Sequence, residues 1–196
     1  MNSTNMTLEY YNCNAADFTA STLNVDFQEN QNRFLKMLNR GDLILDFGCG
    51  SGRDTKYFLE HGMRVEAIDG SIELCRIASG YTGIEVRNML FQDLDEHERY
   101  DAIWACSSIL HLPKKELKDV SIRGHYFDWS TKYGDYFDNK EIVVYIGLSP
   151  TIGSDNGVRG NAGIIWHKDY VDVFTGPMEN KKNFYRLQDF DMKTLL

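Results

Sequence analysis

The sequence predicts an α/β fold in which a parallel β-sheet is covered by helices on both faces. Through residue 120, short apolar runs that fit buried strands alternate with segments that fit helices, which is the pattern of a parallel sheet. The first apolar run ends in a glycine-rich turn that leads into a helix. At 196 residues the chain is long enough for one domain, and we expect one site.

The first 120 residues are expected to hold four strands joined by helices. A helix is predicted over 26–40, because its apolar residues mostly share one face and Gly41 supplies a left-handed stop. The expected strands are 43–47, 64–69, 84–89 and 100–106. The other expected helices run over 53–61, from the N-cap Ser71 to Gly80, and from Pro113 to Val120.

After Val120 the alternation of strand and helix gives way to a glycine-rich region. A strand is predicted over 125–132, and apolar runs predict further strands at 142–148 and 164–174. A last helix is expected over 178–190, from the spacing of Phe184, Leu187 and Phe190. This part of the chain is therefore expected to be built differently from the first part.

Composition and charge exclude several classes of protein. The hydrophobic fraction of 42% is too high for a disordered chain. The net charge of −8 and the scattered lysines and arginines argue against a nucleic-acid partner. Neither a membrane-spanning run nor a signal-peptide pattern is visible, so no membrane partner is expected. The four cysteines lack metal-ligand spacing and fit small buried thiols in a cytoplasmic protein, without a metal site.

The glycine-rich turn predicts a nucleotide-like ligand. Its sequence is Asp46-Phe47-Gly48-Cys49-Gly50-Ser51-Gly52-Arg53-Asp54. Glycines let the backbone turn sharply and let the amides at a helix start approach a ligand. The dinucleotide pattern G-x-G-x-x-G does not fit, because Arg53 occupies the place of its third glycine. A carboxylate at Asp46 would repel a pyrophosphate and attract an ammonium group, so we expect a ligand with an ammonium group.

Carboxylates follow three successive predicted strands, at Asp46, Asp69 and Asp93. At the end of the second strand, Asp69 is placed to accept both hydroxyls of a ribose. With Leu90 and Phe91, Asp93 could hold the edge and face of an adenine, although a solvated loop acid is an equal alternative for Asp93 alone.

These motifs resemble those of the class I S-adenosylmethionine-dependent methyltransferases, most of all the small bacterial single-domain members. The resemblance covers roughly residues 8–120 and is carried by Leu45 to Asp54, Ala67 to Ser71, Phe91 to Leu94 and Tyr100 to Ser107. It implies a Rossmann-like doubly wound sheet of seven strands and S-adenosyl-L-methionine as the cofactor. The methionine moiety would lie at Gly48 to Gly52, the ribose at Asp69 and the adenine near Asp93, with Tyr11 and Cys106 lining the transfer pocket.

The residues expected to bind the cofactor are Tyr11, Asp46, Gly48, Cys49, Gly50, Gly52, Asp69, Gly70, Ser71, Gln92, Asp93, Leu94 and Cys106. His111 lies just beyond the fourth strand and is the candidate catalytic residue, as a base or as a group that orients the acceptor. A packed structural histidine is the alternative for His111, while His125 and His167 are interpreted as structural or exposed.

One domain over 1–196 is expected, with a helical cap at 1–42, a cofactor-binding core at 43–120 and an atypical part at 121–196. Family members usually carry another helix before the fifth strand, which this chain lacks. Either 142–148 and 164–174 replace the missing strands, or the domain is incomplete.

The expected function is methyl transfer to a small-molecule acceptor. A binding or regulatory protein that keeps the fold without turnover is the alternative, and Arg53 and Asp46 disfavour an NAD-dependent oxidoreductase. The oligomeric state is left open.

Overall fold

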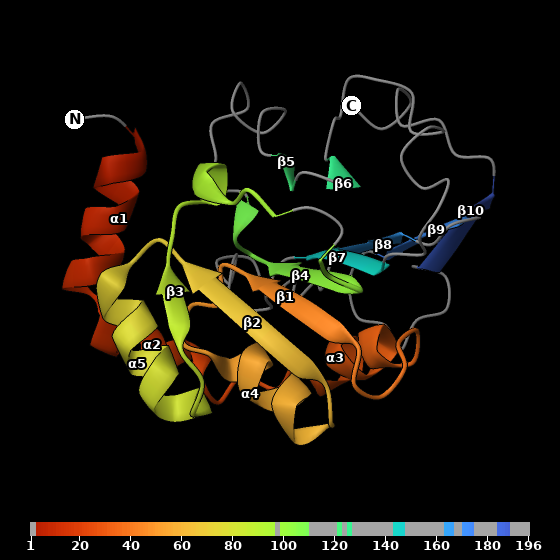
Figure 1. Cartoon of the computed structure of the whole chain (residues 1–196), viewed down its shortest axis with the longest axis horizontal. Coiled ribbons are helices and arrows are strands. Elements are labelled where there is room, and N and C mark those ends of the chain that lie inside the picture. The colour runs from red at the N-terminus through yellow and green to blue at the C-terminus, as the bar shows by residue number, and fades with distance from the viewer. Residues whose placement is uncertain are drawn as a thin grey trace.

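An eight-stranded sheet forms the centre of the molecule (Figure 1). The computed structural model describes residues 3–96 and 99–109, and beyond them the backbone of the strands between 121 and 188. The strand order is β10-β9-β8-β7-β4-β1-β2-β3. The strands of this sheet are β1 (Leu43–Phe47), β2 (Arg64–Asp69), β3 (Val86–Asn88), β4 (Ala102–Cys106), β7 (Val143–Gly147), β8 (Gly163–Trp166), β9 (Tyr170–Phe174) and β10 (Phe184–Gln188). A separate antiparallel pair is formed by β5 (Ser121–Ile122) and β6 (His125–Tyr126).

The centre of the sheet is parallel and contains a reversal in strand order. β1 pairs in parallel with β2 on one side and with β4 on the other, and β4 pairs in parallel with β7. The chain runs outward from β1 through β2 to β3 and then returns to β4 on the far side of β1. Open α/β sheets bind ligands beyond the carboxyl ends of the strands at such a reversal, so the ends of β1 and β4 mark the place for a site.

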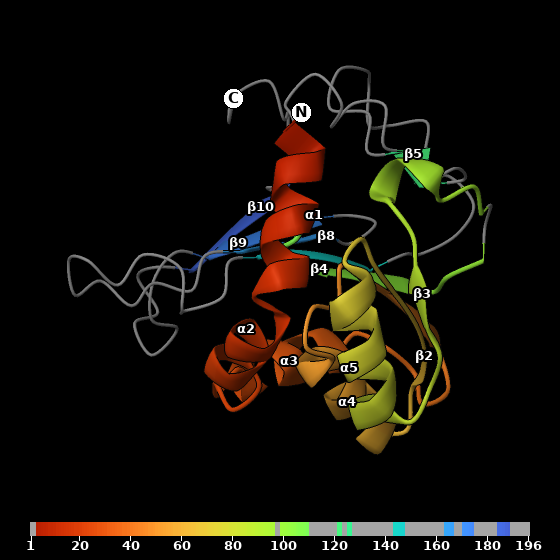
Figure 2. The same cartoon turned by 90° about the vertical axis from the view of Figure 1, so that its left-hand side faces the viewer.

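Helices α2 (Ala15–Thr22), α3 (Gln28–Leu35), α4 (Arg53–Glu60) and α5 (Ile72–Thr82) lie on one face of this sheet, and α1 (Ser3–Cys13) stands beside the sheet and runs past it (Figure 2). A short 3-10 helix, η1, is formed by Phe91–Asp93. The helix predicted from Pro113 to Val120 lies outside the described residues. Within the part of the chain that the structure describes, none of the helices has the length and apolar character needed to cross a membrane.

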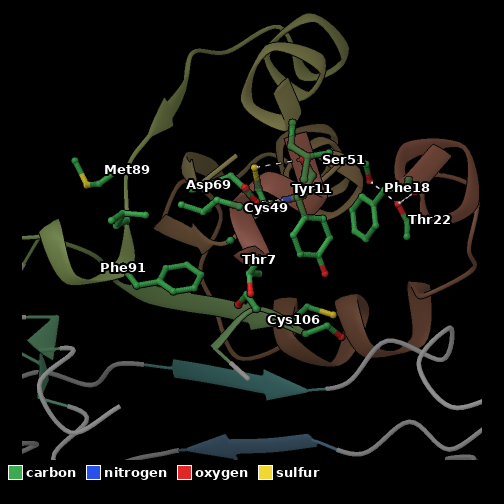
Figure 3. A pocket seen from close by; sticks show the side chains of 18 of the residues that line it. Thr7, Tyr11, Phe18, Thr22, Cys49, Ser51, Asp69, Met89, Phe91 and Cys106 are labelled. Carbon is green, nitrogen blue, oxygen red and sulfur yellow. Dashed lines mark hydrogen bonds between the residues drawn. The ribbon is translucent and has the colours of Figure 1, made fainter. Parts of the chain in front are cut away.

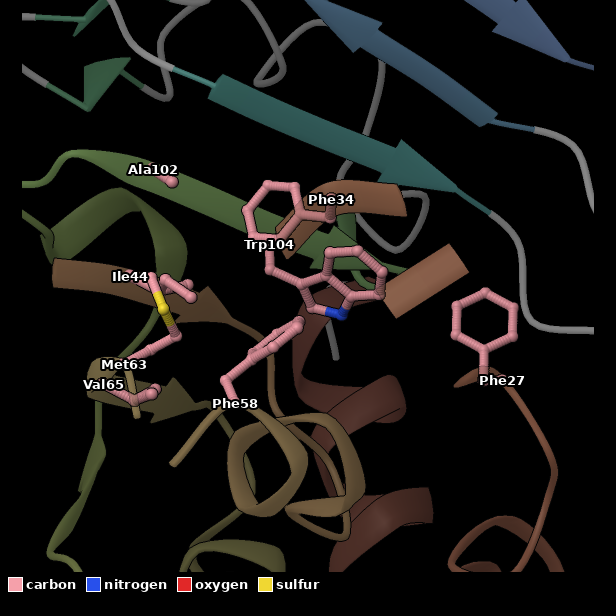
Figure 4. Packing of buried hydrophobic residues seen from close by; sticks show 8 residues of the cluster. All are labelled: Phe27, Phe34, Ile44, Phe58, Met63, Val65, Ala102 and Trp104. Carbon is pink, nitrogen blue, oxygen red and sulfur yellow. The ribbon is translucent and has the colours of Figure 1, made fainter. Parts of the chain in front are cut away.

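The core between the sheet and these helices is built around Trp104 of β4 (Figure 4). This side chain is fully buried, and its ring lies 5.0 Å from that of Phe34, 5.1 Å from Phe58 and 6.0 Å from Phe27. The contacts are edge-on, as aromatic quadrupoles prefer. Because the three partners come from α3, α4 and the segment before α3, the indole ties both helices to the central strand.

Two helices end at different places from those predicted. α3 stops at Leu35, and two tighter turns follow, in which Met37 N donates to Phe34 O and Leu38 N to Leu35 O at 3.1 Å. α5 continues through Gly80 to Thr82 and is capped by Gly83, which takes the left-handed conformation with φ +82°. The predicted end of α5 at Gly80 is therefore wrong, because the left-handed glycine that ends the helix is Gly83, three residues later.

The strands predicted after residue 120 are confirmed in part. β7 lies within the predicted 142–148 strand, while the predicted 164–174 strand is split into β8 and β9, which pair antiparallel through Trp166 and Val171. The predicted helix over 178–190 is wrong, because Phe184–Gln188 is a strand paired with β9. Phe184 and Leu187 fit a helical spacing, but only the pairing with a distant strand decides the conformation. Of the strand predicted over 125–132, the described residues show only β6.

The prediction of an α/β fold with a parallel central sheet is thus confirmed, and the described residues contribute eight strands to the sheet where the resemblance implied seven. Beyond β7, the strands β8, β9 and β10 extend the sheet, and each pairs antiparallel with the strand before it. The strands found within 142–148 and 164–174 therefore belong to the main sheet, as the first of the two alternatives required.

Candidate functional site

A cavity of about 210 Å³ lies beyond the carboxyl ends of β1, β2 and β4. Residues from α1, α2, the glycine-rich turn, the segment after β3 and the end of β4 line it. They are Thr4, Thr7, Leu8, Tyr11, Phe18, Thr22, Gly48, Cys49, Gly50, Ser51, Arg53, Asp54, Asp69, Gly70, Leu74, Met89, Leu90, Phe91, Gln92, Cys106, Ser107 and Ser108. In Figure 3, side chains from the helices, such as Tyr11 and Phe18, and Phe91 from beyond β3 surround this space. The cavity therefore lies at the reversal in strand order.

The glycine-rich turn forms the floor of the cavity and requires glycine for steric reasons. Gly48 has a φ of +87°, and a Cβ there would lie 2.4 Å from the Cβ of Ser108. Gly52 has a φ of +82°, and a Cβ there would meet Thr82 and Ala78 of α5 at 2.9 and 3.1 Å. Gly52 thus lets the turn pack on α5 and does not line the cavity, unlike Gly48, Cys49 and Gly50.

Asp69 at the end of β2 joins the glycine-rich turn to α5. Its carboxylate accepts hydrogen bonds from Gly50 N and Ser71 N, both at 2.9 Å. Burial raises the pKa of Asp69, and the two backbone hydrogen bonds oppose that rise. Because each carboxylate oxygen has a second lone pair, Asp69 can still accept hydroxyl groups from a ligand in the cavity.

Ser71, which was expected to bind the cofactor, has a capping role in the structure. Its Oγ accepts from Leu74 N at 3.2 Å at the start of α5 and donates to Asn12 Oδ1 of α1 at 2.7 Å. Ser71 is not among the residues that line the cavity, whereas its neighbour Gly70 is. A Cβ at Gly70 would lie 2.7 Å from Leu8 Cδ2, so α1 packs closely on this turn.

Asp46 lies behind the turn and does not face the cavity as the sequence had suggested. The residue is 2% exposed, and its Oδ2 accepts from Thr55 Oγ1 of α4 at 2.5 Å. Burial, together with the nearby carboxylate of Asp54, raises the pKa of Asp46 to about 8. An ammonium group in the cavity therefore has no direct access to this carboxylate in the structure.

Asp54 is the centre of a buried polar network beside the cavity. Its Oδ1 accepts from Gln31 Nε2 at 2.7 Å and from Arg53 Nε at 2.7 Å. Its Oδ2 accepts from Trp104 Nε1 at 2.8 Å and from Arg53 Nη2 at 2.9 Å. Both carboxylate oxygens thus accept two hydrogen bonds each, from Gln31 of α3, Trp104 of β4 and the adjacent Arg53. These bonds fix the Arg53 guanidinium in the cavity wall.

Arg53 is also held from its other sides. The guanidinium lies 4.9 Å from the centre of the Phe27 ring, and its Nη2 lies 3.9 Å from Cys106 Sγ. Burial lowers the pKa of Arg53, but the adjacent Asp54 carboxylate outweighs it, so the net shift is upward and the side chain stays charged. The sequence singled out Arg53 only as an obstacle to the dinucleotide pattern and missed its place in the cavity wall.

One face of α1 covers the cavity. Thr4, Thr7, Leu8 and Tyr11 all line it, at the i, i+3, i+4, i+7 spacing of a single helix face. The Tyr11 ring meets that of Phe18 from α2 edge-on, with ring centres 5.1 Å apart. Of these residues the sequence predicted Tyr11 alone. The same spacing in the sequence was the signal that could have found the others.

The segment after β3 supplies the aromatic wall of the cavity. Phe91 lines the space, and its ring lies 4.4 Å from that of Phe47. Gln92 also lines the cavity, as predicted for a cofactor-binding residue. Asp93 is exposed and Leu94 is buried, and neither lines the cavity, because the turn of η1 directs Phe91 and Gln92 toward it and Asp93 to solvent.

The end of β4 closes the remaining side of the cavity. Cys106 lines it as expected, and burial raises the pKa of its thiol, so the sulfur is neutral. Ser107 and Ser108 follow in the cavity wall and were not predicted. His111, the candidate catalytic residue, lies outside the described residues, as does His167, and of His125 only the backbone in β6 is described.

The cysteines are not all buried as expected. Cys75 is buried, Cys13 is exposed, and Cys49 and Cys106 are partly buried at the cavity; all are free thiols. Among the described residues, no group of histidine, cysteine, aspartate or glutamate side chains is arranged to hold a metal ion.

A carboxylate, several hydroxyl groups, backbone amides and an aromatic ring thus converge on one cavity. This combination suits a nucleoside, since the carboxylate and hydroxyls can pair with sugar hydroxyls and Phe91 can pack on a base.

Sequence comparison matches residues 44–123 to a family model described as a methyltransferase domain. A curated relative, an uncharacterized protein of Methanocaldococcus jannaschii, is 34% identical over 85 residues. That similarity covers 39% of this chain and 23% of the relative, so the chain spans only a fraction of the relative's length.

Structural comparison finds methyltransferases of the same fold. The magnesium protoporphyrin IX methyltransferase of Synechocystis PCC 6803 with bound S-adenosylmethionine is similar at a TM-score of 0.54 and 14% identity, over 74% of this chain and 76% of that chain. The 1,6-didemethyltoxoflavin-N1-methyltransferase of Burkholderia thailandensis, with bound 1,6-didemethyltoxoflavin and S-adenosylhomocysteine, has a TM-score of 0.50 at 18% identity. This second similarity covers 98% of this chain and 72% of that chain.

Proposed function

We propose that this chain, whose fold is that of the class I S-adenosylmethionine-dependent methyltransferases, binds S-adenosyl-L-methionine in the cavity and transfers its methyl group to a small molecule. The observation that carries the proposal is the cavity at the strand reversal, in which the glycine-rich turn, Asp69 and Phe91 meet. The match of residues 44–123 to a methyltransferase domain lies on the same segment.

The cavity residues fit the chemical groups of this cofactor. Asp69 has unused lone pairs for ribose hydroxyls, and its two backbone hydrogen bonds hold the carboxylate in place. Phe91 is held against Phe47 and presents an aromatic surface for the adenine. Gly48 and Gly50 line the cavity without a side chain, so we expect their backbone to approach the methionine moiety closely.

The proposed contribution of the protein to transfer is alignment of the cofactor and the acceptor within the cavity. When bound, the cofactor supplies an electrophilic methyl group on a sulfonium, and transfer removes the positive charge of that sulfonium. Tyr11 and Phe18 from the helices and Cys106 from β4 line the space, and we expect them to limit the access of water once the cofactor is bound. Holding donor and acceptor at about 3–3.5 Å makes the reaction effectively intramolecular, which is the main catalytic gain in such displacements.

The acceptor is proposed to be a small molecule. The similar structures carry names of enzymes that act on magnesium protoporphyrin IX and on 1,6-didemethyltoxoflavin, which are both small molecules. Where an acceptor arrives protonated, a base is needed, and His111 stays our candidate for it.

Isothermal titration of the purified chain with S-adenosylmethionine and S-adenosylhomocysteine tests the cofactor. We expect saturable binding that falls by about 10- to 100-fold in Asp69→Ala, since hydrogen bonds to a charged group are among the stronger ones. The matched control is Asp17→Ala, an exposed carboxylate on α2 away from the cavity. Absence of binding to the wild-type chain would overturn the proposal.

Transfer itself is tested by incubating the chain with S-adenosylmethionine labelled in its methyl group and a panel of small heteroatom nucleophiles. Label in any acceptor that depends on Asp69 supports the enzyme. Binding of the cofactor without transfer to any member of a broad panel would favour the alternative, a binding or regulatory protein.

A further inference from the structure

Two charged residues stand at the ends of the segment that forms the aromatic wall of the cavity. Arg87 lies in β3, before this segment, and Glu96 lies after it. Arg87 Nη1 donates to Glu96 Oε1 at 2.7 Å, and Nη2 donates to Glu96 Oε2 at 3.4 Å. Neither residue lines the cavity, whereas Met89 to Gln92 between them all do. The ion pair therefore closes the loop formed by residues 88–95.

This ion pair belongs to a charged cluster on one face of the sheet. Val86 packs against α5, so the alternation of side chains along β3 directs Arg87 to the face opposite α5. Arg87 Nη2 also lies 3.4 Å from Glu66 Oε2 of β2 and donates to Tyr100 Oη at 3.0 Å. The Tyr100 hydroxyl in turn donates to the Glu96 carboxylate. Glu96 is therefore held both by a strand residue and by a buried tyrosine.

The two partners are charged and only partly buried. Burial disfavours the ionised form of Glu96, but the hydrogen bonds from Arg87 and Tyr100 outweigh it, so the pKa of Glu96 is lowered. The side chains of Arg87 and Glu96 are 31% and 21% exposed, and ion pairs near the surface contribute little to the stability of a whole fold. Because the pair joins the two ends of one loop, we expect its effect to be local.

Both ends of the loop are anchored to the rest of the protein. At its start, Asn88 Nδ2 donates to Asp69 O at 3.1 Å, and Met89 N donates to the same carbonyl oxygen at 3.0 Å. At its far end, the loop is held by the buried side chain of Leu94 and by the Glu96 carboxylate. The residues that line the cavity lie between these two anchors.

We propose that Arg87 and Glu96 are positioning residues for the cofactor, which hold the loop in the conformation that presents Phe91 to the adenine. This inference rests on the proposed function. Neither residue touches the ligand. When the ion pair is broken, the loop occupies other conformations as well, and the affinity falls in proportion to the fraction of molecules that keep the binding conformation.

The experiment compares Arg87→Met with Arg76→Met by titration with S-adenosylhomocysteine and with 5′-methylthioadenosine, which lacks the amino acid. Arg76 is the matched control, because its Nε donates to Glu73 Oε2 at 3.1 Å on the surface of α5 and it does not line the cavity. For Arg87→Met we expect both ligands to bind more weakly by the same factor, about 3- to 10-fold. We expect its Tm to fall by no more than about 2–4 °C. For Arg76→Met we expect unchanged binding.

Two further readouts separate positioning from a general structural role. Glu96→Gln keeps the size of the side chain and removes its charge, and it should weaken binding in the same way. The double variant should bind no more weakly than the weaker single variant, because both changes break one contact. In ligand-free Arg87→Met, hydrogen exchange should be faster over 89–96 and unchanged in β1 and β2, and saturating S-adenosylhomocysteine should restore the protection.

The outcomes separate this inference from the proposed function. Failure of the wild-type chain to bind S-adenosylhomocysteine overturns the proposed function, while the exchange comparison still shows whether the ion pair orders the loop. Normal binding by the wild type with unchanged affinity in Arg87→Met overturns the positioning role alone. Faster exchange throughout β1 and β2 also overturns it, because the loss is then one of global stability. A loss of affinity confined to S-adenosylhomocysteine contradicts it as well, since both ligands carry the adenosine.

Discussion

Replacement of Gly48 by alanine tests the geometry of the cavity floor most directly. Two costs follow from the structure. A φ of +87° places an alanine in left-handed space, which costs about 1–2 kcal/mol. The new Cβ would also lie 2.4 Å from Ser108 Cβ, which cannot rotate away because it is fixed to its backbone, and overpacking of this kind costs about 1–3 kcal/mol.

We therefore expect Gly48→Ala to lower the free energy of unfolding by about 2–5 kcal/mol. Urea denaturation followed by far-ultraviolet circular dichroism measures this loss. Binding of S-adenosylhomocysteine is expected to weaken as well, because the turn must shift to relieve the contact.

A double-mutant cycle with Ser108→Gly separates the two costs. That change removes the Cβ and Oγ of Ser108, which are two of the three nearest atoms to the new methyl group, and the third, Phe91 Cζ at 3.0 Å, belongs to the end of a flexible side chain. In the Ser108→Gly background, Gly48→Ala is expected to cost only the backbone part, about 1–2 kcal/mol. A Gly48→Ala protein within about 0.5 kcal/mol of the wild type, or strictly additive effects in the cycle, would refute the reasoning.

Two further predictions concern buried carboxylates. The pKa of Asp46 is raised to about 8 in the folded protein, so the unfolded chain loses this proton at a lower pH than the folded chain does. The free energy of unfolding of the wild type should therefore fall relative to that of Asp46→Asn as the pH rises from about 4 to about 8. Urea unfolding of both proteins at pH 5, 6, 7 and 8 checks this; the raised pKa sets an upper bound of about 6 kcal/mol, and a difference independent of pH would contradict it. Asp54→Ala leaves the donors of Gln31, Arg53 and Trp104 unpaired in a buried place, and we expect a loss of about 3–5 kcal/mol in unfolding free energy. Arg53→Met in the Asp54→Ala background should recover part of that loss, whereas no recovery would show that the buried guanidinium is not its cause.

The sequence by itself determined the central fold and the floor of the site. Strands β1, β2 and β4 and the glycine-rich turn were predicted because their signals are local. Short apolar runs indicate buried strands, and Gly48 and Gly50 indicate a turn with positive φ, which other residues rarely adopt. Asp69 was found for the same reason, since the end of a predicted strand fixes where its carboxylate stands.

The tertiary structure decided which residues actually face the cavity. Asp46 and Asp69 both end parallel strands, yet only packing against α4 shows that Asp46 pairs with Thr55 behind the turn. The face of α1 that covers the cavity, and Phe18 from α2, become visible only once these helices lie over the sheet. The identity of β10 as a strand depends likewise on its pairing with β9.

Ser108 shows this difference most clearly. Nothing in its local sequence distinguishes it from Ser107, and its close packing against Gly48, which lies far away in the chain, is visible only in the folded protein. Local sequence fixes backbone conformation and burial, because these depend on neighbouring residues. The cavity wall is made of contacts between distant segments, and only the folded chain brings those segments together.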